Sequence, residues 1–442
     1  MAGSEDVRRP LSRGSVAALA ALLLLVAGFH ATVLGWAPEP GLFGDEGHYL
    51  GFANRDAREG TTGLLPGNLR FDRRPEFGSR LYAQLAGDGV DNDSLLRRIG
   101  GLQLAMLLGL IAAGFAQGRM LGLGSIGVLT ASALLGLSPW LGFYVYSAWP
   151  EIPHLFFLAL AFVCLLGYAN SMRLAWLVGA GLALGYALFT RGTINAFVPV
   201  VVIFVGAATA WKLSAESRRL RWTRSAAASG TLVVCLIGVV APQLYRNAEA
   251  GHGWSLAANR WDALEAGIRA HHTDYLDPRP PMGERWEISR TYRDQGETWN
   301  QREARARERT LAYIASVPLT QLLADQSRKL GWCLLVSEAF FEQSIGFRGR
   351  WGKPAPRWLR LLRPPARALW YATLALGLVG IVLMVSGSPG WLLLALFVAY
   401  ILLALFAVPM KIRYALPMLP TLCLFAGASV ERVWVAARAR AK

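Results

Sequence analysis

Ten long apolar runs dominate this sequence and constrain its fold more than any other feature. A helix needs about 20 apolar residues to cross the hydrocarbon core of a bilayer, and most of the runs approach that length. They lie at residues 16–36, 99–118, 121–141, 152–170, 174–190, 193–211, 226–245, 368–387, 390–408 and 414–434. Charged residues make up only 17% of the chain, against about 25% in soluble proteins. The sequence therefore predicts an all-α polytopic membrane protein of about ten transmembrane helices.

Two long polar regions divide the expected spans into groups. Residues 1–245 form an N-terminal transmembrane module of seven spans with a first outer loop at 37–98. Residues 246–367 form an extracytoplasmic or interfacial region, and residues 368–442 hold the C-terminal transmembrane helices. Basic residues precede the first span, fill the loop at 211–225 and end the chain. Because cytoplasmic loops carry an excess of Lys and Arg, we expect these three segments to face the cytoplasm.

One basic segment departs from this pattern. Residues 348–367 carry seven Lys and Arg side chains, yet ten spans place them on the outer face. Either 325–345 is an eleventh span, or the segment is an interfacial helix that contacts anionic head groups. We favour the interfacial interpretation because long regions weigh little in the topology rule. Apolar amphipathic segments at 311–323 and 330–341 lie in the same region.

Ionisable residues at the ends of the spans are the candidates for chemistry, because they are costly near lipid unless they are paired or line a wet cavity. Asp45 and Glu46 follow the first span and stand beside His48 and Tyr49. A carboxylate there can act as a general base towards an attacking hydroxyl. The alternative is a solvated loop in which Asp45 caps a helix.

Three further segments are expected on the same outer face. Glu151 begins the fourth span, where it can also simply favour a helix N-terminus. Arg191 lies between the fifth and sixth spans and can hold a phosphate by two parallel hydrogen bonds, or it can be an ordinary snorkelling arginine. Lys411, Arg413 and Tyr414 precede the last span, and two cations there again suit a phosphate. The nearby prolines can equally serve only to shape the start of that helix.

Other classes of site find little support. Residues 91–93 match the short DxD element of metal-dependent sugar transferases, but their place before a span favours a helix cap. The six His residues show no metal-ligand spacing, and no nucleotide-binding glycine loop occurs. No cofactor is indicated, and dependence on a divalent metal stays open. The net charge of +16 points to anionic lipid rather than nucleic acid, because the basic residues cluster at membrane boundaries.

Taken in order, these elements resemble the GT-C superfamily of membrane glycosyltransferases. The likeness is to the family-39-like branch, which includes protein O-mannosyltransferases and the lipid A aminoarabinose transferase. The resembling segments are GDEGHY at 44–49, Arg73-Arg74-Pro75 with Leu81-Tyr82, 137–140 followed by Glu151, 188–191, 247–259, and Arg413-Tyr414 with Leu416-Pro417 and Pro420. Two features depart from the family: 73–82 lacks a second proline, and 265–310 is rich in Arg and Glu.

The resemblance implies a GT-C-type bundle that moves a sugar from a polyprenyl-phosphate carrier to an acceptor hydroxyl with inversion. Asp45 is then the general base, Glu46 a supporting acid or the base itself, and Glu151 a group that orients the acceptor. Arg191, with cations before the last span, would stabilise the departing lipid phosphate. The substrate-binding residues implied are His48, Tyr49, Arg73, Arg74, Tyr82, Arg191, Lys411, Arg413 and Tyr414.

The partners implied are the polyprenyl-phosphate sugar donor, a glycan, lipid or protein acceptor, and membrane lipids, with no nucleic acid. The expected location is a bacterial inner membrane, with the active site on the extracytoplasmic side. Three alternatives stay open. A polyprenyl-lipid transporter or flippase would show internal repeats and acids at mid-membrane depth, whereas a polysaccharide ligase would share the lipid donor. A non-catalytic assembly partner would tolerate loss of Asp45 and Arg191.

Overall fold

The computed structural model describes residues 13–36, 50, 53, 81–86, 90–249, 251, 253–256, 260–268, 299–335, 363–407 and 414–441, and this part of the chain is helical without strands. The helices up to the middle of the chain are α1 (Arg13–Trp36), α4 (Asn92–Met120), α5 (Ser125–Gly136), α6 (Pro139–Val145), α7 (Glu151–Ser171), α8 (Leu174–Thr190), η2 (Gly192–Phe197), α9 (Val198–Lys212) and α10 (Arg218–Glu249). The later ones are α11 (Arg260–Ile268), α14 (Trp299–Ser316), α15 (Leu319–Leu335), α18 (Arg363–Met384), α19 (Pro389–Ala407), η4 (Leu416–Met418) and α20 (Leu419–Arg440).

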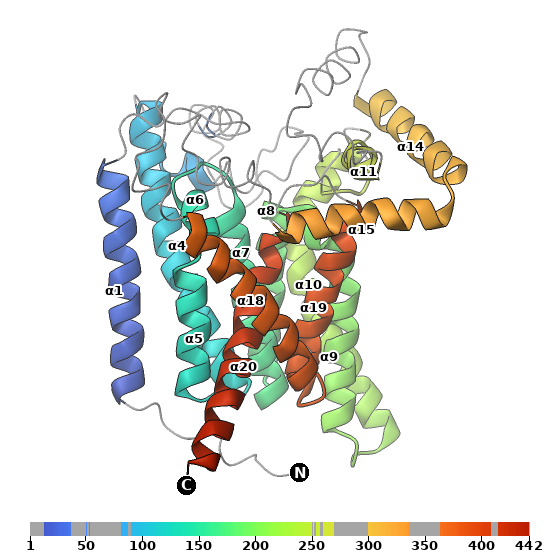
Figure 1. Ribbon diagram of the computed structural model, residues 1–442. Coiled ribbons are helices and arrows are strands. Elements are labelled where there is room, and N and C mark those ends of the chain that lie inside the picture. The colour runs from blue at the N-terminus through green and yellow to red at the C-terminus, as the bar shows by residue number, and fades with distance from the viewer. Residues whose placement is uncertain are drawn as a thin grey trace.

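The long helices stand side by side in one bundle (Figure 1). Eight of the helices in the described ranges are long and apolar enough to cross a membrane, and α5 and α8 are shorter apolar helices among them. Every apolar run predicted from the sequence overlaps one of these ten helices, and the run at 121–141 also reaches into α6. The predicted all-α polytopic membrane fold is therefore confirmed.

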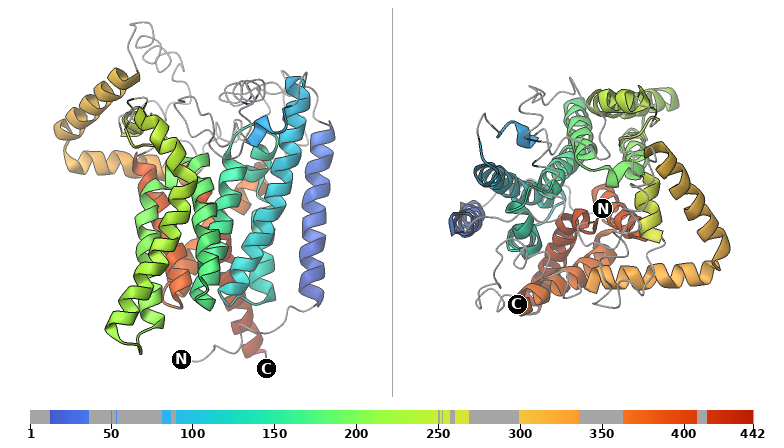
Figure 2. Two further views of the ribbon diagram at one scale, coloured as in Figure 1. Left: turned by 180° about the vertical axis from the view of Figure 1, so that it is seen from behind. Right: turned by 90° about the horizontal axis from the view of Figure 1, so that it is seen from above.

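The two ends of the bundle differ in what they carry. α1 begins and α20 ends at the lower end in Figure 1, which also holds the turn between α9 and α10. At the upper end lie α6, α11, α14 and α15, which are not part of the parallel bundle (Figures 1 and 2). The helices that form the bundle and the helices that cover its upper end are thus separate sets.

Short turns join neighbouring spans into antiparallel hairpins, as the short links in the sequence predict. α4 turns into α5 through Gly122, whose φ of +87° lies in the left-handed region that glycine adopts without strain. α7 turns into α8 through Met172, which caps α7 with a φ of +57°. Each hairpin returns the chain to the end of the bundle from which it came.

The third predicted span is shorter than expected. Instead of one run over 121–141, α5 ends at Gly136 and a separate short helix, α6, starts at Pro139. A proline cannot donate to the preceding turn and disfavours helical backbone in the residue before it. Because the run is apolar on both sides of Pro139, its composition did not indicate this break.

The two amphipathic segments of the outer region also divide at a proline. The sequence pattern separated 311–323 from 330–341, but α14 ends at Ser316 and α15 begins at Leu319, directly after Pro318. α15 lies across the upper ends of the bundle helices rather than along them (Figure 1). In its described residues it is not among the candidate spans. Residues 336–362, which hold the rest of the possible eleventh span and most of the basic segment 348–367, lie outside the described residues, so the choice between the two interpretations stays a prediction.

Close helix contacts rest on glycines. Gly181 and Gly185 of α8 face α10 so closely that a Cβ on Gly181 would lie 2.6 Å from the Leu232 carbonyl oxygen. At the contact of α5 with α20, a Cβ on Gly427 would overlap the carbonyl oxygen of Gly127. Small residues of this kind let membrane helices approach and gain packing contacts that lipid cannot supply.

A carboxylate reinforces the contact between α5 and α20. Glu431 of α20 accepts hydrogen bonds from the backbone N–H groups of Gly124, at 2.7 and 2.9 Å, and Gly127, at 3.1 Å. These are N–H groups at the start of α5, which otherwise lack partners within the helix. The carboxylate of one helix therefore caps the N-terminus of another.

The first helix stands at the edge of the bundle (Figure 2). Ser15 Oγ donates to Ser125 Oγ at 2.6 Å, near the lower end. His30 Nδ1 is hydrogen-bonded to the hydroxyl of Tyr146 at 2.5 Å, near the upper end. Polar side chains thus connect α1 to α5 at one end and to the segment after α6 at the other.

Candidate active site

The α7–α8 hairpin brings two of the predicted site residues together. α7 starts with Glu151 and runs 21 residues, and α8 runs 17 residues and is followed by Arg191 as its C-cap residue. Because the hairpin is antiparallel, the start of α7 and the end of α8 meet at the upper end of the bundle. A carboxylate suits a helix N-terminus and a cation suits a helix C-terminus, so each side chain complements the helix that carries it.

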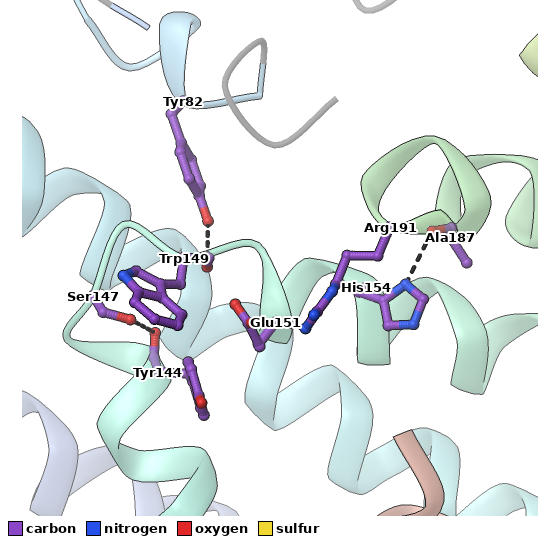
Figure 3. A network of polar contacts seen from close by, with 8 residues as sticks. All are labelled: Tyr82, Tyr144, Ser147, Trp149, Glu151, His154, Ala187 and Arg191. Atoms are coloured by element: carbon purple, nitrogen blue, oxygen red, sulfur yellow. Dashed lines mark hydrogen bonds and ion pairs between the residues drawn. The ribbon is translucent and has the colours of Figure 1, made fainter. Parts of the chain in front are cut away.

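Glu151 and Arg191 form a buried ion pair. Arg191 Nη1 donates to Glu151 Oε1 at 2.6 Å, and the two side chains are 11% and 2% exposed, respectively. The sequence predicted that both residues lie on one face, and the structure places them in direct contact (Figure 3). The second carboxylate oxygen, Oε2, is buried and has no hydrogen-bond partner within the described part of the chain.

A third predicted residue stacks on this pair. The guanidinium carbon of Arg191 lies 5.0 Å from the ring centroid of Tyr414, which directly precedes η4 and α20. This cation–π contact helps to orient the guanidinium. Among the described residues, Glu151 is the hydrogen-bond partner of the Arg191 side chain, so most of its five N–H donors stay available to a ligand.

His154 is a residue that the sequence analysis did not single out. Its side chain is fully buried, and its Nδ1–H donates to the carbonyl oxygen of Ala187 at 2.9 Å. The same carbonyl accepts the backbone N–H of Arg191 at 3.0 Å. Thus the first turn of α7 holds Arg191 twice, by the Glu151 carboxylate and through its backbone (Figure 3).

The sequence signal for His154 was present but indirect. It follows Glu151 by three residues, and side chains three apart on a helix share one face. Nothing in the spacing marked Ala187 as its partner, because that contact depends on the way in which α7 and α8 pack.

Tyr82 occupies a supporting position rather than an exposed one. It is fully buried in a small apolar cluster with Leu95 and Ala148, and its hydroxyl donates to the carbonyl oxygen of Trp149 at 2.9 Å. This bond fixes the backbone two residues before Glu151 (Figure 3). In this structure Tyr82 therefore shapes the segment that leads into α7.

Residues 91–93 form the expected helix cap. Asp91 precedes α4, and its Oδ1 accepts the backbone N–H of Ser94 at 2.7 Å while its Oδ2 accepts the Ser94 hydroxyl at 2.8 Å. These bonds, the backbone bond foremost, hold the pKa of the Asp91 carboxyl below its usual value. The capping interpretation, rather than a sugar-transferase DxD element, accounts for this segment.

The other predicted site residues lie outside the described residues. They are Asp45, Glu46, His48, Tyr49, Arg73, Arg74, Lys411 and Arg413. Within the described ranges, no group of three or more His, Cys, Asp or Glu side chains is placed to hold a metal ion. The described part of the candidate active site is accordingly Glu151, His154, Arg191 and Tyr414, with Tyr82 behind it.

Comparison with known proteins gives a likeness in fold. No protein-family model and no curated protein matches the sequence. Among solved structures, the Archaeoglobus fulgidus oligosaccharyltransferase matches with a TM-score of 0.50 and 14% identity, over 96% of this chain and 51% of its own. ArnT from Cupriavidus metallidurans, bound to undecaprenyl phosphate, matches with a TM-score of 0.50 and 15% identity, over 95% of this chain and 61% of its own.

The chain thus spans about half to three fifths of the length of these two proteins. At this level of identity the likeness concerns the arrangement of the helices. It agrees with the resemblance that the ordered sequence motifs indicate, and this chain has the transmembrane helical fold that these two proteins share.

Proposed function

We propose that this chain is an inverting glycosyltransferase that moves a sugar from a polyprenyl-phosphate-linked donor to an acceptor hydroxyl at the outer face of the membrane. The observation that carries the proposal is the buried Glu151–Arg191 pair at the upper end of a GT-C bundle. The neighbour ArnT was crystallised with undecaprenyl phosphate, and a guanidinium is well suited to bind the phosphate of such a lipid.

In the proposed reaction, the acceptor oxygen attacks the anomeric carbon while the bond from that carbon to the phosphate oxygen breaks. The configuration inverts, and the proton of the acceptor hydroxyl passes to Asp45, with Glu46 as support or as the base itself. Negative charge develops on the departing lipid phosphate, where the N–H donors of Arg191 stabilise it. The unpartnered Oε2 of Glu151 accepts a hydrogen bond from a substrate hydroxyl.

The charge of the described site supports a contribution from further cations. Glu151 and Arg191 together are neutral, so a phosphodiester placed there would carry an uncompensated negative charge in a buried position. Arg413 is the residue before Tyr414, which contacts Arg191, and Lys411 lies two residues earlier. We assign these two cations to the lipid phosphate together with Arg191.

The distribution of basic and aromatic residues supports the proposed orientation. The turn between α9 and α10 and the end of α20 lie at the lower end of the bundle (Figure 1), and both segments are rich in basic residues. They are Lys212, Arg218, Arg219, Arg221, Arg224, Arg438 and Arg440. Trp211 and Trp222, 77% and 60% exposed, belong to the same end and suit the aromatic belt of a membrane interface. The lower end is then cytoplasmic, and the Glu151–Arg191 pair faces the extracytoplasmic side.

The test is sugar transfer by the purified full chain in lipid. A panel of labelled polyprenyl-phosphate sugars is offered together with membrane and envelope extracts as the source of the acceptor. We expect the wild type to release label from one carrier, and Asp45→Asn to be slower by about 10²-fold or more while it still binds the carrier.

Asp91→Asn is the matched control, because Asp91 is also a carboxylate at the upper end of the bundle but caps a helix, and asparagine caps as well as aspartate. Its turnover should equal that of the wild type. If the wild type binds several carriers and consumes none, the transferase proposal is wrong. Near-normal turnover by Asp45→Asn would show that Asp45 is not the general base.

A further inference from the structure

The helices α14 and α15 meet outside the bundle. Seen from above, α15 extends from the bundle past its edge, and α14 returns from that point towards α11 (Figure 2). We call residues 311–323 at this junction the elbow. It lies near the level of the upper ends of the bundle helices (Figure 1), and no described helix stands beneath it.

The inner half of α15 is firmly attached to the protein. Lys329 is 7% exposed and donates to the carbonyl oxygens of Gly267, at 2.8 Å, and Phe406, at 2.9 Å. These carbonyls lie at the C-terminal ends of α11 and α19, where a cation is favourable. Trp370 of α18 donates to the carbonyl of Leu334 at 2.6 Å. Three helices thus fix the position and rotation of α15.

One apolar stripe runs along the whole of α15. Leu319, Leu323, Leu330 and Leu334 follow at spacings of four, seven and four residues, which places them on one side of a helix. In the inner half, Leu330 and Leu334 pack against the main core. In the elbow, Leu319 and Leu323 are 68% and 51% exposed. The same face is therefore covered where the bundle lies below it and uncovered beyond the bundle edge.

α14 changes in the same way along its length. Its first part packs on α11, where Arg309 forms a two-bond ion pair with Glu265 at 2.7 and 2.8 Å and Thr310 is fully buried. Its last turns carry Leu311 and Ile314, which are 47% and 38% exposed. The elbow therefore carries four large, partly exposed apolar side chains from two helices.

We propose that the elbow is embedded in the outer surface of the bilayer that the bundle spans. Its stripe continues the direction in which the inner half of α15 contacts the bundle, so beyond the bundle edge the stripe meets the lipid that surrounds it. An amphipathic helix with its apolar face in the head-group boundary and its polar face in water is a stable arrangement. The occupant of the uncovered face is thus lipid.

The experiment places one environment-sensitive fluorescent amino acid in the full chain, at Leu323 or, as the matched control, at Gln321. Two residues apart on a helix point about 160° away from each other, and Gln321 lies on the polar, exposed side of α15. Each variant is reconstituted into phosphatidylethanolamine–phosphatidylglycerol vesicles, with or without bromine atoms on the upper acyl chains, which quench nearby fluorophores.

We expect bromolipid to remove about half or more of the emission at position 323, because interfacial helices bury their apolar face about 5–10 Å deep, and to leave position 321 nearly unchanged. If bromolipid quenches the probes at 321 and 323 equally, or does not quench the probe at 323, the proposal is wrong. A blue-shifted but unquenched probe at 323 would also overturn it, because protein rather than lipid would then cover the elbow. None of these results depends on the proposed transferase activity.

Discussion

Breaking the Glu151–Arg191 pair from either side gives a prediction that separates its structural role from its chemical one. Both side chains are almost fully buried, at 2% and 11% exposure. Removal of one partner from a buried pair leaves an uncompensated charge and costs about 3–5 kcal/mol. We therefore expect Arg191→Met and Glu151→Gln each to destabilise the protein by about this amount, whereas the double variant should lose much less.

The assay is thermal unfolding in one detergent at one scan rate, followed by tryptophan fluorescence. For a chain of this size about 1 kcal/mol corresponds to roughly 1–2 °C, so each single variant should unfold about 5 °C below the wild type. Sugar transfer is measured on the same samples. Loss of the guanidinium should lower turnover by about 10²–10³-fold in Arg191→Met and equally in the double variant, whose stability has recovered.

Arg309→Met is the matched control, because it breaks an ion pair with Glu265 that lies outside the candidate active site and is more exposed, at 29% and 15%. It should lower the unfolding temperature slightly and leave transfer unchanged. The reasoning is refuted if the effects of Arg191→Met and Glu151→Gln on stability simply add in the double variant. It is equally refuted if the double variant transfers sugar at the rate of the wild type.

Three further predictions concern packing, positioning and capping. Gly427→Ala should lower stability by about 1–3 kcal/mol, because its Cβ would overlap the backbone of α5, whereas Gly238→Ala, with no atom within 4 Å of the added methyl, should not; thermal unfolding distinguishes the two. His154→Leu should lower turnover by about 2–10-fold through loss of one hydrogen bond worth about 0.5–1.5 kcal/mol, with little change in carrier binding, and His154→Asn should restore part of it if the bond to the α8 carbonyl positions the arginine. The cap bonds to Ser94 hold the pKa of the Asp91 carboxyl below its usual value. Their contribution to the stability of α4 is therefore complete at neutral pH and is lost as the pH falls through the lowered pKa. Hydrogen exchange of the first turn of α4 at pH 7 should rise in Asp91→Ala but not in Asp91→Asn.

The spans and the placement of Glu151 and Arg191 at one end of the bundle were predictable because each depends on a local pattern. A long apolar run is sufficient to indicate a membrane helix, and counting spans assigns each loop to one end of the bundle. The two residues begin and end consecutive helices of similar length, so their level in the membrane also follows. Their direct contact required the rotation of α7 against α8, which no spacing rule provides.

The remaining differences have equally specific causes. The break at Pro139 lay inside an apolar run, where composition outweighed a single backbone constraint. The break at Pro318 lay inside the predicted amphipathic segment 311–323, because hydropathy alone does not separate the residues before the proline from those after it. The role of His154 depends on a carbonyl of the neighbouring helix, and that of Tyr82 on the carbonyl of Trp149. Backbone partners of this kind have no sequence signature, since every residue carries the same carbonyl group.

The position of α1 at the edge of the bundle has a consequence for biogenesis. α1 is the first of the described helices to leave the ribosome, yet the groups that its polar side chains meet, Ser125 and Tyr146, are synthesised more than a hundred residues later. Until then α4 is the one long described helix against which α1 can pack. Hydrogen bonds between membrane helices contribute only about 0.6 kcal/mol each, so the attachment of α1 to α5 and to the segment after α6 is late and weak. A chain released before Ser125 is complete would therefore keep α1 inserted without either hydrogen bond, exposed to the quality-control proteases of the membrane.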